Sequence, residues 1–461
     1  MTNRVFSGED QLAFARLSGD WNPMHVDEIA ARRAIFGGRV IHGIHLLLWA
    51  LDHWFSQHGA PRAIGAVAAD FKRGILVGDQ LECVIAATGP EVVLQIQRAG
   101  VVMSEIRVRL DLPVSYAPAL AASREVPCWE ASFAEAAAVN GVEPLALDPA
   151  LCASLLPYAA AALPPYQIAS LLASTRIVGM ISPGLHSLYL GLEMEFNAPA
   201  GEPELRYSAE RADARYGLLR LAVKGPGVSG KLHTLMRPAP CAQPAFDGMR
   251  QLVADGEFRS QRALVIGGSR GLGEVTAKLL AAGGAEVIAT YQRGQADAEQ
   301  VAADIRSGGG QCVAAAFDIQ QPDAASFPPP THVYYFATPR IALDKSIPFS
   351  RERFELFNQF YVSGFVHSLL CLGRGEEALT AMYPSTVFLD QPVPGALEYC
   401  AAKAAGEEAS RHLMQRFPRW RIHTPRLPRM MTDQNAGVMP SRIASPVAVM
   451  LAELRRMNQV L

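Results

Sequence analysis

The sequence predicts an α+β part built on an antiparallel sheet, followed by an α/β part built on a doubly wound parallel sheet. Three observations in the 461 residues support this fold class. A strongly apolar helix is followed by a series of alternating strands, part of that pattern recurs in mid-chain, and the C-terminal part alternates strands with helices. A chain of this length is too long for a single core, so we expect two or three domains.

The composition excludes several classes of protein. Half of the residues are apolar and 19% are charged, which is ordinary globular composition, and the net charge of −2 gives no reason to expect a nucleic-acid partner. The seven cysteines are dispersed without a Cys-x-x-Cys pair, which indicates reduced thiols and no metal site. The N-terminus lacks the apolar run of a signal peptide, and IHGIHLLLWALDHWF is too short to span a bilayer. We therefore expect a cytoplasmic protein that does not enter membranes.

The first block, residues 1–119, is expected to wrap one helix in an antiparallel sheet. Ser7 and Asp10 have the spacing of a capping box at the start of a helix. A helix over 43–57 is apolar on most sides, so other elements must cover it. Strands are predicted over 63–73, 79–88, 91–100 and 101–112, with Gly-Asp and Gly-Pro turns between them.

The second block, residues 120–245, repeats part of the first. The stretch SPGLHSLYLGLEMEF aligns with IHGIHLLLWAL, so that Gly184 falls on Gly43 and His186 on His45. Strands follow over 203–214, 216–225 and 229–238. We interpret the pattern as a half-decayed internal duplication. The alternative is a coincidence between two apolar helices that begin with glycine.

The third block, residues 246–461, begins after a proline- and alanine-rich joint and alternates strands with helices, which predicts a parallel sheet. Gly267, Gly271 and Gly273 lie between its first strand and first helix. Glycine allows a positive φ and a close approach to a pyrophosphate, whose charge the helix N-terminus accepts. Ser269, Arg270 and Leu272 complete this candidate nucleotide-binding turn.

Tyr399 and Lys403 lie four residues apart, on one face of a predicted helix. An ammonium beside a phenol favours the phenolate and lowers the pKa of the phenol. The phenol would then serve as the acid that protonates a carbonyl oxygen as hydride arrives.

The spacing of the glycine turn and the Tyr-x-x-x-Lys pair resemble the short-chain dehydrogenase/reductase family. The resemblance implies a Rossmann-like domain in which Ser385 or Thr386 holds the substrate oxygen, and we place Ser385 slightly ahead. It also implies cofactor contacts at Asp318, Ala337, Thr338, Pro428 and Thr432, besides Tyr399 and Lys403. The sequence departs from the family at Ile266, Tyr361 and Arg429, and Tyr361 stands where a helper asparagine is common.

The choice of nicotinamide cofactor depends on charge. No acidic residue closes the second strand to bind a ribose 2′-hydroxyl, whereas Arg270 and Arg293 are placed to bind a 2′-phosphate. We therefore expect NADPH rather than NADH. The alternative is that both arginines are solvated surface groups.

The stretch SGDWNPMHVD in the first block combines Asp20 and His25, and His42-Gly43 follows at the start of the apolar helix. Asp20 and Pro23 by themselves are explained by a helix start. An imidazole and a carboxylate that meet at one point activate a water molecule. A glycine amide at a helix N-terminus polarises a thioester carbonyl.

This string resembles the MaoC-like, (R)-specific enoyl-thioester hydratases of the hot-dog fold. The matching residues are Ser18, Gly19, Asp20, Asn22, Pro23, His25, Asp27, Phe36, Gly37, His42 and Gly43. The family implies that Asp20 and His25 are the catalytic pair, that Asn22 shapes their loop and that the Gly43 amide binds the oxyanion. The second block has no such string, so a second hot-dog there is expected to be catalytically bare, to pack sheet to sheet on the first and to widen an acyl tunnel. His186 either lines a pocket or is a core histidine.

Both resemblances imply chemistry at the β-carbon of acyl thioesters. The leading hypothesis is a bifunctional, NADPH-dependent 3-oxoacyl-thioester reductase and 3-hydroxyacyl-thioester dehydratase, which acts on coenzyme A or acyl-carrier-protein thioesters as a homodimer or larger homo-oligomer. One alternative is the catabolic pair, an enoyl-CoA hydratase with a 3-hydroxyacyl-CoA dehydrogenase. Another is that one half is a non-catalytic scaffold.

Overall fold

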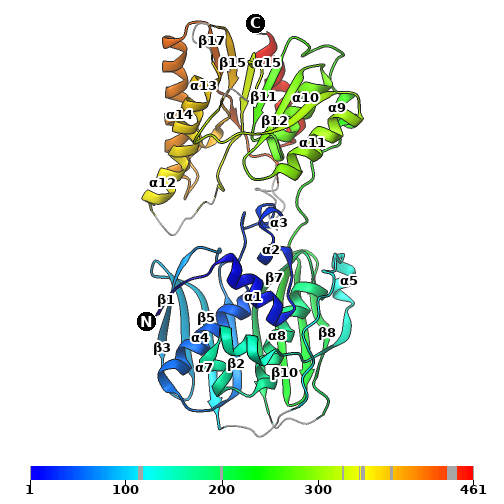
Figure 1. Cartoon of the computed structure of the whole chain (residues 1–461), viewed down its shortest axis with the longest axis vertical. Helices are drawn as coiled ribbons and strands as arrows, with labels where there is room; N and C mark the ends of the chain where they lie inside the picture. The colour runs from blue at the N-terminus through cyan, green and yellow to red at the C-terminus, as the bar shows by residue number, and fades with distance from the viewer. Residues whose placement is uncertain are drawn as a thin grey trace. The chain divides into compact units, whose positions relative to one another are not determined.

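The computed structural model describes residues 2–112, 118–197, 201–323, 327–341, 343, 348–373, 377–432 and 444–459. The chain divides into two compact units, and the division falls after Ala239 (Figure 1). The first predicted block and all of the second except residues 240–245 lie in the N-terminal unit. No helix in these described ranges combines the length and the apolar character that crossing a bilayer requires.

The first half of the N-terminal unit has the predicted helix and strands. Its elements are β1 (Thr2–Val5), α1 (Gly8–Ser18), α2 (Pro23–Val26), α3 (Glu28–Arg32), α4 (Gly43–His58), β2 (Ala63–Phe71), β3 (Gln80–Ala87), β4 (Val92–Arg98) and β5 (Val101–Asp111). Ser7 and Asp10 form the predicted capping box at the start of α1. Helix α4 buries most of its side chains, as its apolar sequence requires.

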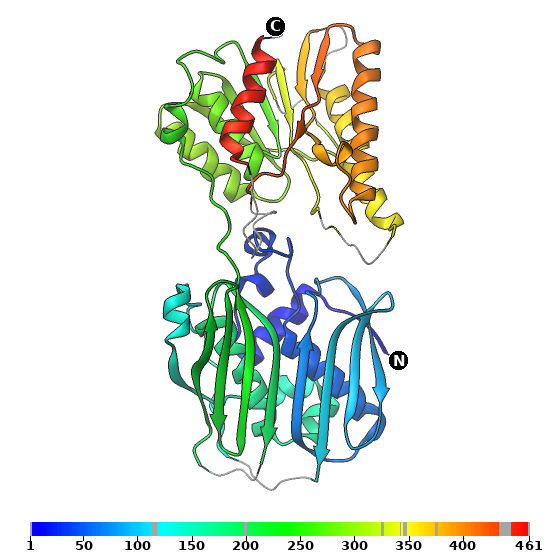
Figure 2. The same cartoon turned by 180° about the vertical axis from the view of Figure 1, so that it is seen from behind.

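The second half repeats this arrangement. Its elements are α5 (Phe133–Ala137), β6 (Asn140–Pro144), α6 (Pro149–Leu155), α7 (Pro157–Ala162), α8 (Pro165–Arg176), the π-helical turn η1 (Ile177–Ile181), β7 (Ser187–Phe196), β8 (Glu204–Asp213), β9 (Leu218–Gly225) and β10 (Val228–Met236). Ten strands form one sheet in the order β1-β3-β4-β5-β2-β7-β10-β9-β8-β6. The two halves of this order mirror each other, and the helices α4 and α8 lie on the same side of the sheet (Figure 2).

Two details of the predicted duplication are wrong. Gly184 and His186 do not begin a helix, because the segment from Ser187 onward is strand β7, and the buried helix of the second half is α8 instead. The second half also does not pack sheet to sheet on the first, because β2 and β7 pair antiparallel and make the sheet continuous. The apolar residues of β7 alternate as in a strand, whereas those of α4 have helical spacing. Because a glycine stands at the start of both runs, the sequence comparison aligned a strand with a helix.

The C-terminal unit has the predicted alternation of strands and helices. Its elements are α9 (Phe246–Arg250), β11 (Arg262–Ile266), α10 (Gly271–Ala282), β12 (Glu286–Tyr291), α11 (Gln295–Ser307), β13 (Gln311–Ala316), β14 (His332–Tyr335), α12 (Arg351–Asn358), the π-helical turn η2 (Gln359–Gly364), α13 (Phe365–Leu372), β15 (Leu379–Met382), β16 (Ser385–Thr386), the 3-10 turn η3 (Val387–Leu389), α14 (Leu397–Arg416), β17 (Trp420–His423), β18 (Arg426–Leu427) and α15 (Pro446–Gln459). Six strands pair in parallel in the order β13-β12-β11-β14-β15-β17. The strand order reverses between β11 and β14, and the glycine turn directly follows β11. Doubly wound sheets bind their ligands at such a reversal point.

Candidate active sites

Asp20 lies in the turn that ends α1. Gly19 closes the helix with a left-handed φ of 74°, and the chain then turns Asp20 into the interior, where it is 1% exposed. Its Oδ1 accepts a hydrogen bond from the Asn22 amide at 3.2 Å, and its Oδ2 accepts one from the Thr175 hydroxyl at 2.7 Å. The carboxyl group is therefore held from both sides.

His25 lies on the short helix α2, opposite Asp20. Its Nδ1 is 2.7 Å from the carbonyl oxygen of Val40, and because a carbonyl only accepts, Nδ1 carries the proton. Nε2 of the neutral ring is then the basic atom. One ligand atom each from Asp20, His25 and His42 lies within 4.8 Å of the others, and the His25 ring stacks on His42 at 3.8 Å.

Burial shifts the pKa values of this pair in opposite directions. Burial raises the pKa of Asp20, although the charge of His25 and the Thr175 hydroxyl oppose the rise. Burial also lowers the pKa of His25, against the favourable charge of Asp20. Burial thus favours the protonated form of Asp20 and the neutral form of His25. These forms suit Asp20 as an acid and His25 as a base.

Gly43 is the first residue of α4, and its amide points out of the helix N-terminus. His42 supplies the N-cap position, its backbone amide donates to Gln11 Oε1, and its ring Nε2 donates to the Asp20 carbonyl at 3.0 Å. A Cβ at Gly43 would lie 2.8 Å from the Phe71 ring. The close approach of Phe71 requires glycine here, and the helix N-terminus next to the acid–histidine pair fits an oxyanion.

The second half of the unit holds this site in place, which the sequence did not reveal. Thr175 and Arg176, at the end of α8, are both buried. The Arg176 guanidinium is 2.6 Å from Glu143 and donates to the Ser18 carbonyl at 3.0 Å. The Asn22 side chain donates to the Gly179 carbonyl at 2.9 Å. The available signal was the set of polar residues Ser170, Ser174, Thr175 and Arg176 toward the end of a helix that also carries many apolar residues.

In the C-terminal unit, the glycine turn after β11 has a shape that only glycine permits. Gly267 has a φ of 79°, and a Cβ at Gly273 would lie 2.1 Å from the Gly267 carbonyl oxygen. The turn leads into the N-terminus of α10, a helix of 12 residues. This cradle of backbone at a helix N-terminus fits a diphosphate group.

The structure places Thr386, and not Ser385, beside Tyr399. The Ser385 hydroxyl donates to Glu407, which also binds the Arg426 guanidinium, so the serine faces away from the phenol. The Thr386 hydroxyl lies next to the phenol and favours its ionised form. The preference for Ser385 is therefore corrected, because β16 alternates its side chains and directs neighbouring hydroxyls to opposite sides.

The Lys403 ammonium is closer to the ring of Tyr361 than to the ring of Tyr399, whose pKa it was expected to lower. Burial raises the pKa of Tyr399 to about 12, against the Thr386 hydroxyl. The Lys403 ammonium instead lies 3.8 Å from the centre of the Tyr361 ring and donates to the Pro384 carbonyl at 2.7 Å. Burial lowers the pKa of Lys403 to about 7. Tyr361, whose hydroxyl is 2.5 Å from Thr338 Oγ1, fills the place expected for an asparagine.

The other predicted cofactor positions lie around the carboxyl ends of the strands. Ser269 is buried in the glycine turn, Arg270 is the N-cap residue of α10, and Leu272 packs against the core of the unit. Arg293 is exposed just after β12. Asp318 follows β13 and accepts from the Gln320 amide, while Ala337 and Thr338 follow β14 and Pro428 and Thr432 follow β18. Most of these residues thus follow the carboxyl ends of strands in the six-stranded sheet, whereas Pro428 and Thr432 follow β18 of a separate two-stranded sheet.

Two families match the chain, one at each end. Residues 2–107 match the family described as MaoC like domain, and residues 261–326 match the family described as short chain dehydrogenase. A 3-hydroxyacyl-[acyl-carrier-protein] dehydratase, mitochondrial, from Arabidopsis thaliana is 36% identical over 78 residues, which are 17% of this chain and 46% of that protein. The chain thus spans about half the length of that curated relative.

Two solved structures resemble the C-terminal part. A short chain dehydrogenase/reductase family protein is 25% identical, with coverage of 43% of this chain and 89% of that chain and a TM-score of 0.38. A short chain dehydrogenase from Burkholderia cenocepacia, crystallised in complex with NADP, is 22% identical, with coverage of 44% and 91% and a TM-score of 0.38.

Proposed function

We propose that this chain, which carries a MaoC-like domain at its N-terminus and a short-chain dehydrogenase domain at its C-terminus, is a bifunctional acyl-thioester enzyme. The C-terminal domain would reduce a 3-oxoacyl thioester to the 3-hydroxyacyl thioester with NADPH. The N-terminal domain would then dehydrate that product to the 2-enoyl thioester. The observation that carries the proposal is the buried pair of Asp20 and His25, and the dehydratase named for the Arabidopsis relative supports it.

The dehydration step uses the two protonation states that burial favours. The unprotonated Nε2 of His25 takes the proton from C2 of the substrate, and the electrons of that C–H bond form the C2=C3 double bond. Asp20 gives its proton to the hydroxyl group that leaves C3, so that water is released. The Gly43 amide binds the thioester oxygen, on which negative charge develops.

The reduction step would be assembled around the glycine turn. When bound, the nicotinamide group supplies a hydride to the carbonyl carbon. The turn from Gly267 to Gly273 would bind the diphosphate, and Arg270 and Arg293 support a 2′-phosphate and hence NADPH. Thr386 would orient the substrate oxygen and Tyr399 would give it a proton.

A second candidate applies to the C-terminal domain alone. The Lys403 ammonium lies over the Tyr361 ring, and burial raises the pKa of Tyr399, which favours a domain that binds a nucleotide without reducing a substrate. Fluorescence titration with NADPH would show nucleotide binding by the wild-type chain. The variant Gly271→Asp should lose that binding. Oxidation of NADPH by a 3-oxoacyl thioester would then exclude the scaffold.

The proposal is tested by incubation with 3-oxoacyl thioesters and NADPH, followed by mass analysis of the products. The wild-type protein should produce the 3-hydroxyacyl and then the 2-enoyl thioester. Asp20→Asn should stop at the 3-hydroxyacyl thioester, because the amide has no acidic proton to give to the leaving hydroxyl. Wild-type dehydration by Asp20→Asn would refute the assignment of the acid, and a strong preference for NADH would refute the synthetic direction.

A further inference from the structure

A cavity of about 500 Å³ opens in the second half of the N-terminal unit, outside the acid–histidine pair. Its walls include Glu130, His186, Arg215, Tyr216 and Arg237. Two of these polar residues are buried, since His186 is 6% exposed and Arg237 is 7% exposed. Buried cations are found where a partner is present or where one binds.

The hydrogen bonds of Arg237 are incomplete. Its Nη2 donates to the Leu185 carbonyl at 3.0 Å, but its Nε has no partner among the described residues. His186 Nε2 is 3.1 Å from Glu130 Oε1, and its Nδ1 has no described partner either. The Glu130 side chain is 67% exposed, so it lies at the rim of the cavity and leaves the guanidinium without a buried counterion.

Arg237, on the wall of this cavity, shares a hydrogen-bond acceptor with the loop of the acid–histidine pair. The Leu185 carbonyl that Arg237 binds also accepts from the Asn22 side chain at 3.5 Å. The Cys128 thiol, whose pKa burial raises to about 12, lies within the electrostatic influence of both Asp20 and Arg237. The Leu185 carbonyl thus links Arg237 to the loop that carries Asp20 and His25.

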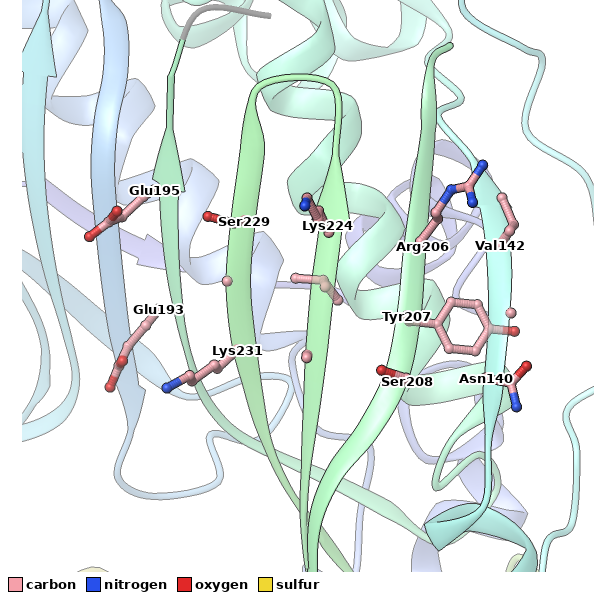
Figure 3. Close-up of a pocket in the computed structure, with 14 residues that line it drawn as sticks. Asn140, Val142, Glu193, Glu195, Arg206, Tyr207, Ser208, Lys224, Ser229 and Lys231 are labelled. Atoms are coloured by element: carbon pink, nitrogen blue, oxygen red, sulfur yellow. The ribbon is translucent and has the colours of Figure 1, made fainter. Parts of the chain in front are cut away.

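The larger hollow on the outer face of the sheet lacks these features. It has a volume of about 780 Å³ and lies on β6 to β10, where the side chains stand out from the strands (Figure 3). Its basic residues, Arg206, Lys224 and Lys231, are balanced by Glu193 and Glu195, and Arg206 is bonded to Glu204. Most of these side chains are exposed, so they need no ligand to satisfy them.

We propose that Arg237 anchors the phosphate of the phosphopantetheine arm that carries the acyl thioester. The planar guanidinium suits a phosphate. Arg215 and Arg237 carry two positive charges on the cavity wall, against the single negative charge of Glu130. The arm is common to coenzyme A and to acyl carrier proteins, so the site recognises the chemistry that both carriers share. This inference rests on the proposed function, because the acyl end of the same substrate must reach Asp20.

Kinetics with two kinds of thioester test the proposal. Arg237→Met should raise the KM for a 3-hydroxyacyl-coenzyme A about tenfold relative to the KM for the N-acetylcysteamine thioester, which has no phosphate. Glu130→Gln removes the competing carboxylate and should change this ratio in the opposite direction. Arg206→Met, an exposed arginine on the outer sheet face, is the matched control and should leave the ratio unchanged.

The outcomes are distinguishable. A loss of activity on both thioesters in parallel would assign Arg237 a structural role and overturn the site, as would an unchanged ratio. The same measurement with a carrier-protein thioester shows which carrier loses more from Arg237→Met, and that carrier is the source of the phosphate.

Calorimetric titration separates this inference from the proposed function. The wild-type protein should bind 4′-phosphopantetheine at least tenfold more tightly than pantetheine, and Arg237→Met should abolish the difference. Equal affinities would refute the phosphate site even if dehydration is observed. Dehydration of neither thioester by the wild type would refute the proposed function, whatever the titration shows.

Discussion

At the scale of single residues, the Thr175 hydroxyl has the most direct effect on the proposed acid. It donates to Asp20 Oδ2 at 2.7 Å, and both groups are buried, so water does not replace this bond when it is lost. The hydrogen bond favours the ionised carboxylate and thus limits how far burial raises the pKa of Asp20. Thr175 is therefore a positioning residue that also tunes the acid.

Thr175→Val should lower kcat for dehydration about tenfold, because the isosteric methyl group leaves Asp20 held on one side only. The same change should move the alkaline limb of the pH profile to higher pH, since removal of the hydrogen bond raises the pKa of the acid further. Thr175→Ser is the control and should retain both kcat and the limb. A lower kcat with an unmoved alkaline limb would indicate a packing defect alone.

We expect His25, the proposed base, to determine the acid limb of the same profile. Burial lowers the pKa of its imidazole below the ordinary 6.5, so the base stays unprotonated at pH values where a solvated histidine is charged. We expect kcat/KM for dehydration to fall only below pH 6.5, through protonation of this ring. The measurement is a pH–rate profile with the N-acetylcysteamine thioester, and a limb with its midpoint above 6.5 would contradict the assignment.

At the scale of elements, Arg176 joins helix α8 to the end of α1. Its guanidinium pairs with Glu143 at 2.6 Å and binds the backbone carbonyls of Ser18 and Pro144, and these groups are almost entirely buried. Removal of one partner of such a pair leaves the other charge without compensation. The contact that Arg176 makes between α8 and the end of α1 therefore depends on both charges together.

Arg176→Met should destabilise the N-terminal unit by about 3–5 kcal/mol, because Glu143 is then buried without a partner. The double change Arg176→Met with Glu143→Leu should recover much of that loss, since no buried charge remains. Denaturant unfolding of the full chain, followed by a probe in this unit, measures both. A double variant as unstable as the single one would show that packing, and not the uncompensated charge, causes the loss.

At the scale of the whole molecule, the chain places the two proposed active sites on separate compact units. In the proposed function the product of the reduction would be the substrate of the dehydration, and covalent linkage would raise the local concentration of that shared intermediate. The benefit of the fusion is therefore kinetic, and it is measurable without cutting the chain.

An equimolar mixture of Asp20→Asn and Tyr399→Phe chains should convert a 3-oxoacyl thioester to the 2-enoyl thioester with a longer lag than wild-type chains at the same number of working sites. The reason is that every hydroxyacyl intermediate must diffuse from one molecule to another. The time course of enoyl absorbance measures the lag. Equal lags would show that linkage gives no kinetic advantage.

Local sequence patterns predict much of the fold and part of the site. The capping box at Ser7, the helix from Gly43 and most strands of the two larger sheets follow from spacing and apolar period, because these patterns act within one element. The proximity of Asp20 to His25 also follows locally, since His25 lies five positions after Asp20, on the short helix α2. The turn from Gly267 to Gly273 is specified in the same way, by backbone geometry that only glycine permits.

Contacts between distant segments were decided by the tertiary structure alone. Thr175 reaches Asp20 across 155 positions of sequence, and no spacing rule connects the two. The choice of Thr386 over Ser385 depends on which hydroxyl Glu407 binds from α14. Local pattern determines where a side chain sits on its own element, whereas the partner that it meets depends on how elements pack, and packing sums many weak contacts over the whole unit.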